Sequence, residues 1–512
     1  MDRKPFQHRD KAFLLLDGLL VGALSGGVAV FYRYILGIME DWRHLLFEWT
    51  SMGGLVFLIA AAVLSAIIVI RLLKWAPLSG GSGIPQVQGE ILGIFRMSAF
   101  PVAVSKIIGG SLATLIGLAL GREGPSIQIG AAMAKIFSKG VQRDKTKEKL
   151  LITAGAAAGL SAAFSAPLAG VLFSVEEIHK NTSKAMIAVT LTASIVADYI
   201  AAYVFKLTPV FSFTITELLP LKYYGHIIAL GAITAVVGVL FCKGIVLGQR
   251  FYQRLPIPVH FRMIFVFLTA VLIGHFLPDI LGGGHHVIEN LESNPEAVQY
   301  IALLLAGRFL FTCFSFGSGV QGGIFLPILV IGGIVGILYH RFILSLGLIP
   351  DYYLANMIVL SMTAILTAVV RAPILSIILV LEMNGNLNQM LGLCMASSVA
   401  YFVSEFLKEK PIYETLLQRM IEKGPEGEEA TYESTIFETI VPHGSKLENK
   451  RIKDIGLPEN CLLIEIKRGG ELYIPKGKMV LQGGDEIAIL TTDYDVYTLR
   501  ESLREYLAVD QY

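Results

Sequence analysis

Long apolar segments alternate with short polar ones along the first 420 residues of the chain. Several of these segments approach the ~20 residues that an α-helix needs to cross a bilayer. The clearest windows run from Phe13 to Leu36, Leu55 to Ile70, Met186 to Val204, Ile227 to Leu247, Ile264 to Leu277, Ile324 to Tyr339, and Met357 to Val370. The pattern therefore predicts a bundle of membrane-spanning helices.

Other apolar segments are short and are interrupted by glycine and proline. These breaks lie at Gly81–Pro85, Gly121–Pro125, Ala166–Pro167, Gly319–Pro327 and Ala372–Pro373. Non-helical backbone is tolerated at membrane depth only where it is buried in protein or lines a watery cavity. We therefore expect discontinuous helices in the interior of the bundle.

The composition separates this body from a polar tail. Of the 512 residues, 54% are hydrophobic and 16% are charged, whereas a soluble domain usually has about 25% charged residues. The last 92 residues, Ile421–Tyr512, hold 29 of the 83 charged side chains. We expect a membrane domain over residues 1–420, an acidic linker at 421–433, and a water-soluble domain at 434–512.

The tail shows the pattern of a small α+β domain. β-rich runs occur at Thr435–Pro442, Cys461–Gly470, Glu471–Pro475 and Asp485–Thr492. The Gly-Gly pair at the end of the second run predicts a hairpin turn. Residues 498–507 predict a closing helix.

Basic loops predict the topology. Lysine and arginine are concentrated at the N-terminus and in Val141–Lys149 and Gly248–Arg262, whereas His285–Ala297 has neither. The positive-inside rule places the basic loops and both termini in the cytoplasm, and His285–Ala297 on the outer side. No cleavable signal peptide is evident. A net charge of +1 gives no indication of nucleic-acid binding. The four scattered cysteines suggest neither a zinc site nor a disulfide framework. No cofactor is expected.

Two pairs of similar segments indicate an internal repeat. Ala166–Glu177 and Ala372–Met383 both have Ala-Pro, an apolar run and an acid at the eleventh place; Gly-x-x-Gly begins at Gly121 and at Gly319. The offsets of 206 and 198 residues fit one duplication. Chance similarity among apolar segments is the alternative. Transporters built from two such halves bind substrate near the repeat interface.

Three of the breaks share one design, in which small residues precede an apolar helix. They are Gly80–Gly89, Gly121–Gly130 and Gly322–Val330. A helix start presents unpaired backbone N–H groups and about half a positive charge, so converging starts predict an anion site. The alternative for any one break is a tight turn or close helix packing. No phosphate-loop lysine follows, which argues against nucleotide binding.

Glu123 lies in this setting. Between Ile107 and Ala134, Arg122 and Glu123 are the only charged residues. A carboxylate beside helix-start N–H groups competes with an anion for the same place and leaves it when protonated. The alternative is a buried acid paired with Arg122. An acid inside a membrane is a functional hypothesis by default.

The stretches "GSGIP", "GREGP", "GGIFLP" and "KPIY", in this order and spacing, resemble the CLC family of chloride channels and chloride/proton exchangers. The segments "AGAAAGLSAAFSAPLAGVLFSVEE" and "VRAPILSIILVLEM" resemble it too, and the similarity spans about residues 10–420. The resemblance implies an all-α polytopic membrane protein with two inverted repeats. It also implies a homodimer in which each subunit carries its own anion pathway.

The resemblance assigns a chloride site. Ser82 and Tyr413 match residues whose hydroxyls contact the ion from two sides, and Ile324 and Phe325 match residues whose backbone N–H groups point at it. Gly124 is expected at the same site. Serine at position 82 matches chloride-preferring members, and the intact motifs argue against the fluoride-exporting branch.

The resemblance also assigns the proton chemistry. Glu123 matches the gating glutamate, and Glu177 matches the internal glutamate that accepts protons from the cytoplasm in exchangers. A solvated charge at a helix end is the alternative for Glu177. Gln86 and Gln88 stand where many relatives have acids. Lys106 either sets the potential of the pathway or snorkels to an interface.

Residues Phe437–Leu507 resemble the TrkA C-terminal (RCK-C) domain, which implies a cytoplasmic regulatory module for a small ligand. Dimer stabilisation alone is the alternative.

We therefore expect a chloride/proton antiporter, from a bacterial inner membrane, with a passive chloride channel as the alternative. A membrane enzyme is disfavoured by the absence of HExxH, GxSxG and nucleotide-loop motifs, and a ligand sensor would show no ion flux.

Overall fold

The structure is a computed structural model of the whole chain. It describes residues 8–48, 52–179, 183–207, 210–211, 213, 215, 217–256, 258–294, 296–385, 387–423, 434–457, 461–469, 471–492, 499 and 503. The chain forms two compact units. The first comprises Met1–Val87 and Met97–Leu417, and the second comprises Gln88–Arg96 and Gln418–Tyr512.

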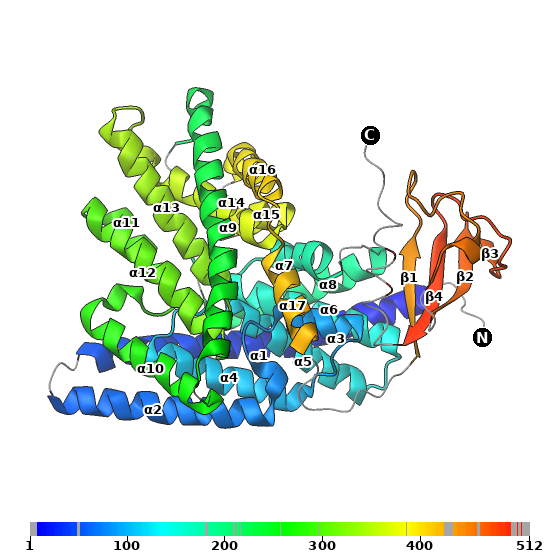
Figure 1. Cartoon of the computed structure of the whole chain (residues 1–512), viewed down its shortest axis with the longest axis horizontal. Helices are drawn as coiled ribbons and strands as arrows, with labels where there is room; N and C mark the ends of the chain where they lie inside the picture. The colour runs from blue at the N-terminus through cyan, green and yellow to red at the C-terminus, as the bar shows by residue number, and fades with distance from the viewer. Residues whose placement is uncertain are drawn as a thin grey trace. The chain divides into compact units, whose positions relative to one another are not determined.

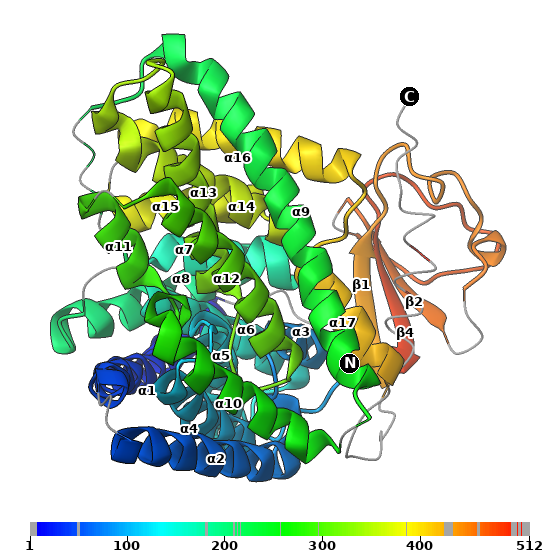
Figure 2. The ribbon, with the colours of Figure 1, turned by 60° about the vertical axis from the view of Figure 1, so that its left-hand side comes forward.

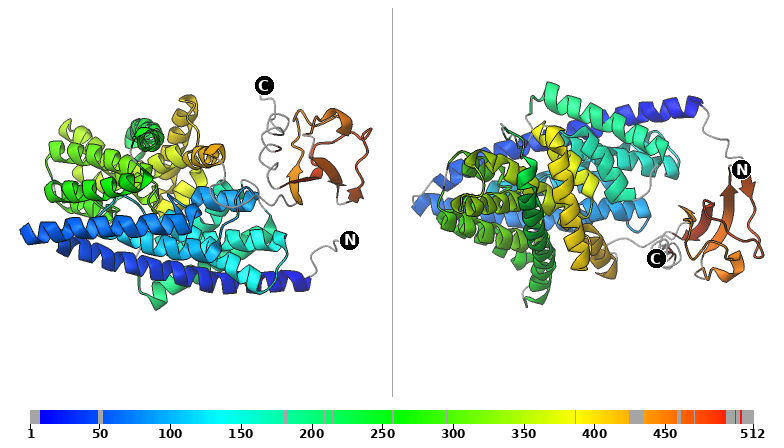
Figure 3. Two further views of the ribbon diagram at one scale, coloured as in Figure 1. Left: turned by 60° about the horizontal axis from the view of Figure 1, so that its bottom comes forward. Right: turned by 90° about the horizontal axis from the view of Figure 1, so that it is seen from above.

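The first unit is helical (Figure 1). The α-helices of the chain are α1 His8–Glu48, α2 Met52–Trp75, α3 Ile84–Leu92, α4 Ala99–Ile116, α5 Glu123–Gly140, α6 Lys145–Phe164, α7 Pro167–Phe173, α8 Lys184–Tyr199, α9 Tyr224–Arg254, α10 Val259–Phe276, α11 His285–Ser293, α12 Val298–Gly317, α13 Phe325–Ser345, α14 Leu354–Val370, α15 Pro373–Asn384, α16 Met390–Phe406 and α17 Ile412–Lys423. The long helix α9 packs against α12, α14 and α16. Figure 3 shows the helices from two further sides.

The predicted apolar windows all fall on helices, which confirms the polytopic helical body. Among the described residues, eight helices are long and apolar enough to cross a membrane. Two of them, α4 and α12, were not among the predicted windows. Each carries a buried cation, Lys106 on α4 and Arg308 on α12, that interrupts the apolar run. The predicted window on α10 is a shorter apolar helix.

The glycine and proline breaks mark helix starts. Each of the five breaks lies at the first turn of a helix, namely α3, α5, α7, α13 and α15. Two of these helices are short, with nine residues in α3 and seven in α7. Figure 2 shows how short these two helices are beside the long helix α9. The predicted discontinuous helices are therefore present.

The two halves are related as a repeat, but in a different register from the one the sequence suggested. Gly121 pairs with Gly323 in an antiparallel bridge, and the helices begin at Glu123 and Phe325. Gly121 therefore corresponds to Gly323, and the alignment with Gly319 was wrong. An extra glycine-containing turn before Gly323 produced the misalignment. Reciprocal antiparallel pairing of equivalent residues is what inverted halves related by a two-fold axis produce.

The acids of the Ala-Pro repeat join the two halves. The carboxylate of Glu176 accepts hydrogen bonds from Ile374 and Leu375 N–H at the start of α15, at 3.2 and 2.6 Å. The carboxylate of Glu382 accepts from Leu168 and Ala169 N–H at the start of α7, at 2.9 and 2.8 Å. Each half thus caps a helix of the other half with a negative charge at its positive end.

The tail forms a four-stranded sheet with the order β1-β4-β2-β3. Its strands are β1 Ser434–Ile440, β2 Leu462–Arg468, β3 Glu471–Tyr473 and β4 Glu486–Thr492. β2 and β3 pair as the predicted hairpin. Most of the expected linker and closing helix lies outside the described residues, although Leu499 and Leu503 belong to the apolar core of this sheet.

A buried ion pair secures the sheet. Arg468 donates two hydrogen bonds of 2.7 Å to the fully buried carboxylate of Asp485. Gln482 N–H adds a third at 2.8 Å. Burial raises the pKa of Asp485, but the hydrogen bonds from Arg468 and Gln482 and the charge of Arg468 together outweigh it and hold that pKa below its usual value. The carboxylate is therefore charged at neutral pH.

We expect Glu382→Ala and Glu176→Ala to destabilise the protein by similar amounts. Each change removes a carboxylate that accepts two backbone N–H groups, which costs about 1.5–3 kcal/mol per charged hydrogen-bonded group. The measurement is the thermal midpoint of the purified protein in detergent. Glu422→Ala, at an exposed acid of α17, is the control. A midpoint for either variant as high as that of the control would contradict the capping role.

Candidate functional site

Backbone hydrogen bonds join the three glycine-rich breaks. Gly121 and Gly323 exchange two N–H···O bonds of 2.7 Å. Gly81 N–H donates to Gly319 O, and Gly322 N–H donates to Gly81 O, both at 3.1 Å. The starts of α3, α5 and α13 are thereby held around one interior point, as the design shared by the breaks predicted.

This approach requires glycine at position 124. A Cβ atom there would lie 2.5 Å from Ser82 O and 2.6 Å from Ser82 Oγ. Gly83 is also constrained, because its φ is +104° and a Cβ would lie 2.8 Å from Gln128. The Gly124 backbone at the second residue of α5 therefore lies directly against the Ser82 loop, which brings these two predicted site residues together.

The hydroxyls of Ser82 and Tyr413 also meet here. Both side chains are buried, with exposed fractions of 2% and 0%. The two hydroxyls lie close enough to interact, yet neither forms a well-aligned hydrogen bond within the described protein. Two buried hydroxyls with unused donors are suited to hold an anion between them.

Ile324 and Phe325 contribute backbone. Ile324 is the N-cap of α13, Phe325 is its first residue, and both side chains are fully buried. The Phe325 ring packs on Phe164 with centroids 5.5 Å apart, which fixes the start of the helix. The first N–H groups of a helix have no intrahelical acceptor, so this start presents donors to the interior.

The Glu123 carboxylate lies among these helix starts. Its side chain is fully buried, and Oε2 accepts from Leu326 N–H, in the first turn of α13, at 3.3 Å. Oε1 has no hydrogen-bond partner in the described protein. Among the described residues there is no Arg122–Glu123 ion pair within 4.0 Å, so the structure does not support the paired-acid alternative. An acid of one half thus occupies the helix start of the other.

Glu177 lies on the π-helix η2 Ser174–His179 that continues α7. Its side chain is 4% exposed, so the alternative of a solvated charge at a helix end was wrong. Tyr413 lies within electrostatic range of both Glu177 and Glu123. π-Helical turns occur frequently at functional sites, and this one turns Glu177 inward while Glu176 caps α15.

Buried polar side chains support the loops. Lys106 is fully buried and donates to Gly81 O, so the snorkelling alternative was wrong. Gln86 accepts from Gly83 N–H at 3.0 Å and donates to Gly80 O. A carboxylate at position 86 would lack the donor for the second bond. The glutamine therefore clamps the Ser82 loop in a way that an ionised acid cannot.

Two further glutamines were missed from the sequence. Gln128 on α5 donates to Leu78 O at 2.8 Å, and Gln321 donates to Ser105 Oγ at 3.0 Å. Both are fully buried. An amide within a stretch of glycine and apolar residues was the available signal, because a buried amide needs partners. These residues position the loops rather than line the site.

Taken together, the site offers partial positive charge from helix starts, two unpaired hydroxyls and a carboxylate in the same place. Such a site can hold an anion without a fixed full charge, and protonation of Glu123 changes what it attracts. The geometry thus supports exchange between a bound anion and a carboxylate.

Comparison with known proteins agrees with this geometry. The family model described as "Voltage gated chloride channel" matches residues 61–405. A second model, the TrkA-C domain, matches residues 436–504.

Individual relatives are transporters by name. The chain is 32% identical over 447 residues to "H(+)/Cl(-) exchange transporter ClcA" of Vibrio cholerae serotype O1, covering 82% of this chain and 91% of the relative. It is 33% identical over 430 residues to the protein of the same name from Vibrio vulnificus, covering 80% and 90%. The crystal structure of "a slow cyanobacterial Cl-/H+ antiporter" has a TM-score of 0.75 and 29% identity, over 80% of this chain and 98% of that one.

We expect Gly124→Ala to weaken anion binding about tenfold or more. The added Cβ would overlap Ser82, and overpacking of this kind costs about 1–3 kcal/mol. Titration calorimetry of the purified protein with chloride measures the change. Gly140→Ala is a matched control in the same helix, because no atom lies within 4 Å of its Cβ position. Equal affinities for the two variants would contradict the close approach at Ser82.

Proposed function

The chain belongs to the CLC family of voltage gated chloride channels and transporters, and from this premise we propose that it exchanges chloride for protons across a membrane. The observation that carries the proposal is the hydrogen bond from Leu326 N–H to the Glu123 carboxylate. It places a protonatable anion at a helix start that also suits chloride. The names of the relatives, an H(+)/Cl(-) exchange transporter and a Cl-/H+ antiporter, support the same activity.

Chloride binds between the two hydroxyls and the helix starts. Ser82 and Tyr413 donate their otherwise unpaired hydroxyls. The backbone N–H groups of Gly124, Ile324 and Phe325 add donors from the first turns of α5 and α13. Such dipoles stabilise the ion and still allow it to leave, because none of them carries a full charge.

Glu123 gates the pathway by competing with chloride. As a carboxylate it occupies the α13 start and excludes a second anion by repulsion. When it takes up a proton, it loses that charge and releases the Leu326 N–H to the incoming ion. Protonation and anion passage therefore alternate at one position, which couples the two fluxes.

Glu177 supplies the proton from the cytoplasmic side. It is buried on η2 and interacts electrostatically with Tyr413, which also interacts with Glu123. The charges of both acids therefore act on the same tyrosine. The proton path begins at Glu177 and ends at Glu123, while chloride moves past Ser82 and Tyr413.

The proposed domain organisation, oligomeric state and location of the protein follow those of the family. The membrane domain, residues 1–420, forms a homodimer with one pathway per subunit, and both termini lie in the cytoplasm of a bacterial inner membrane. An acidic linker, residues 421–433, leads to the TrkA-C domain at 434–512, which binds a small regulatory ligand. The protein acts as a transporter rather than as an enzyme.

Glu123→Ala is expected to abolish proton coupling and to retain chloride flux. The change removes the carboxylate that takes up and releases a proton beside the anion. Purified protein in liposomes is given a chloride gradient, and a pH electrode records proton movement. Wild type should drive protons uphill, and the variant should move chloride without protons. If wild type moves chloride and protons never follow, the protein is a passive channel.

Glu177→Gln is expected to reduce proton transport more than tenfold while chloride still moves. The amide keeps the size of the side chain and removes its proton affinity. The same liposome assay reports both fluxes. Glu422→Gln, at an exposed acid of α17, is the control and should transport as wild type does. Unchanged coupling in Glu177→Gln would contradict its role as proton donor.

A further inference from the structure

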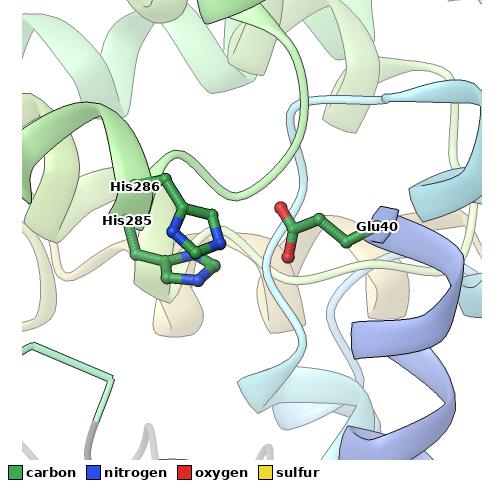
Figure 4. Close-up of side chains that lie close together, drawn as sticks. All are labelled: Glu40, His285 and His286. Atoms are coloured by element: carbon green, nitrogen blue, oxygen red, sulfur yellow. The ribbon is translucent and has the colours of Figure 1, made fainter. Parts of the chain in front are cut away.

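A cluster of metal-ligating side chains lies outside the site described above. Glu40 near the end of α1 faces His285 and His286, the first two residues of α11 (Figure 4). One ligand atom from each residue lies within 4.8 Å of the others. The two imidazole rings have centroids 3.9 Å apart. Elements distant in sequence thus present two nitrogens and a carboxylate to one point.

The chemistry of this set suits a transition metal. Zn²⁺ binds histidine nitrogen at about 2.0–2.1 Å and carboxylate oxygen at about 2.0–2.2 Å, and three protein ligands leave a position for water. The ligand atoms need to approach by about 1–1.5 Å for tetrahedral coordination. The His286 side chain is 57% exposed, so its ring is not enclosed by the protein on all sides. Imidazole nitrogen favours Zn²⁺ over Mg²⁺ or Ca²⁺.

The individual side chains are arranged for coordination. His285 Nδ1 is buried and has no hydrogen-bond partner in the described protein. Glu40 is oriented by Arg43, which donates to its Oε1 at 3.1 Å and leaves Oε2 for an ion. Glu289 Oε2 lies 3.6 Å from His286 Nδ1 and adds negative charge. The positive charges of Arg43 and Arg122 oppose a cation, so we expect moderate rather than structural affinity.

The location connects this cluster to the gate. One cavity is lined by Glu40 and His285 and also by Gly121, Arg122 and Leu326. Gly121 and Leu326 lie next to Oε2 of the Glu123 carboxylate. An ion held by the cluster therefore lies at a cavity that also borders Gly121 and Leu326, two residues next to the Glu123 carboxylate. The cluster begins the segment His285–Ala297, which has no lysine or arginine and fits the outer side.

We propose that Glu40, His285 and His286 bind Zn²⁺ or a similar divalent transition-metal ion on the outer side and that the bound ion slows transport. The inhibitory part rests on the proposed transport function, whereas the binding part does not. The ion obstructs the cavity beside the gate. It also adds two positive charges near Glu123, which oppose its protonation and so the release of the gate.

Binding is tested first, without reference to transport. Full-length protein with its affinity tag removed and treated with chelator is titrated with Zn²⁺ by calorimetry. We expect one ion per chain, with affinity at least tenfold weaker in the double variant His285→Gln/His286→Gln. His275→Gln, at an exposed histidine of α10, is the control and should bind as wild type does. Equal binding by wild type and the double variant would overturn the site.

Transport is tested second, in liposomes with and without Zn²⁺ on both sides. Wild type and His275→Gln should lose most of their chloride flux at saturating Zn²⁺ and recover it with chelator, and the double variant should keep it. Binding that depends on the histidines but leaves flux unchanged would overturn the inhibitory part. Wild type without chloride flux even in the absence of Zn²⁺ would refute the proposed transport, and calorimetry would still decide the site.

Discussion

The two reciprocal hydrogen bonds between Gly121 and Gly323 fix the geometry on which the site depends. They join equivalent residues of the two halves at 2.7 Å, so the starts of α5 and α13 face one point. Neither bond is possible without close backbone approach. A Cβ at Gly121 would lie 2.5 Å from Glu123 Oε2, and one at Gly323 would lie 3.1 Å from Gly124 N. The absence of a side chain at Gly121 therefore leaves the space that the Glu123 carboxylate occupies.

A site built from partial charges needs a support that holds its loops still. The cations and amides near the glycine-rich breaks supply it by bonding to backbone carbonyls. Lys106 donates to Gly81 O, Gln86 to Gly80 O and Gln128 to Leu78 O. These carbonyls are buried, and an unpaired buried carbonyl costs about 1–3 kcal/mol. The polar residues thus satisfy buried carbonyl groups that would otherwise lack a donor.

Much of the fold was predictable from the apolar segments and from the glycine and proline residues that interrupt them. The apolar segments indicate which parts of the chain are buried, and the interruptions indicate where helices begin. The pattern failed where a buried cation satisfied by distant carbonyls interrupted an apolar helix, as Lys106 does in α4 and Arg308 in α12. The register of the repeat failed because glycines on both sides of the true pair looked alike. The roles of Gln128 and Gln321 could not be predicted because their hydrogen-bond partners are distant in sequence. The histidine pair is visible in the sequence, but its third member, Glu40, comes from another helix.

The crossed caps at Glu176 and Glu382 have a consequence for synthesis on the ribosome. The start of α7 leaves the ribosome long before its acceptor, which lies 214 residues downstream of Leu168. At about 5–20 residues per second, the first half waits about 10–40 s with those N–H groups uncapped. During that time the half is an incomplete folding unit within the bilayer. The first half must therefore avoid aggregation and degradation until the second half has been synthesised and inserted. A protein built of two independently stable halves would not have this requirement.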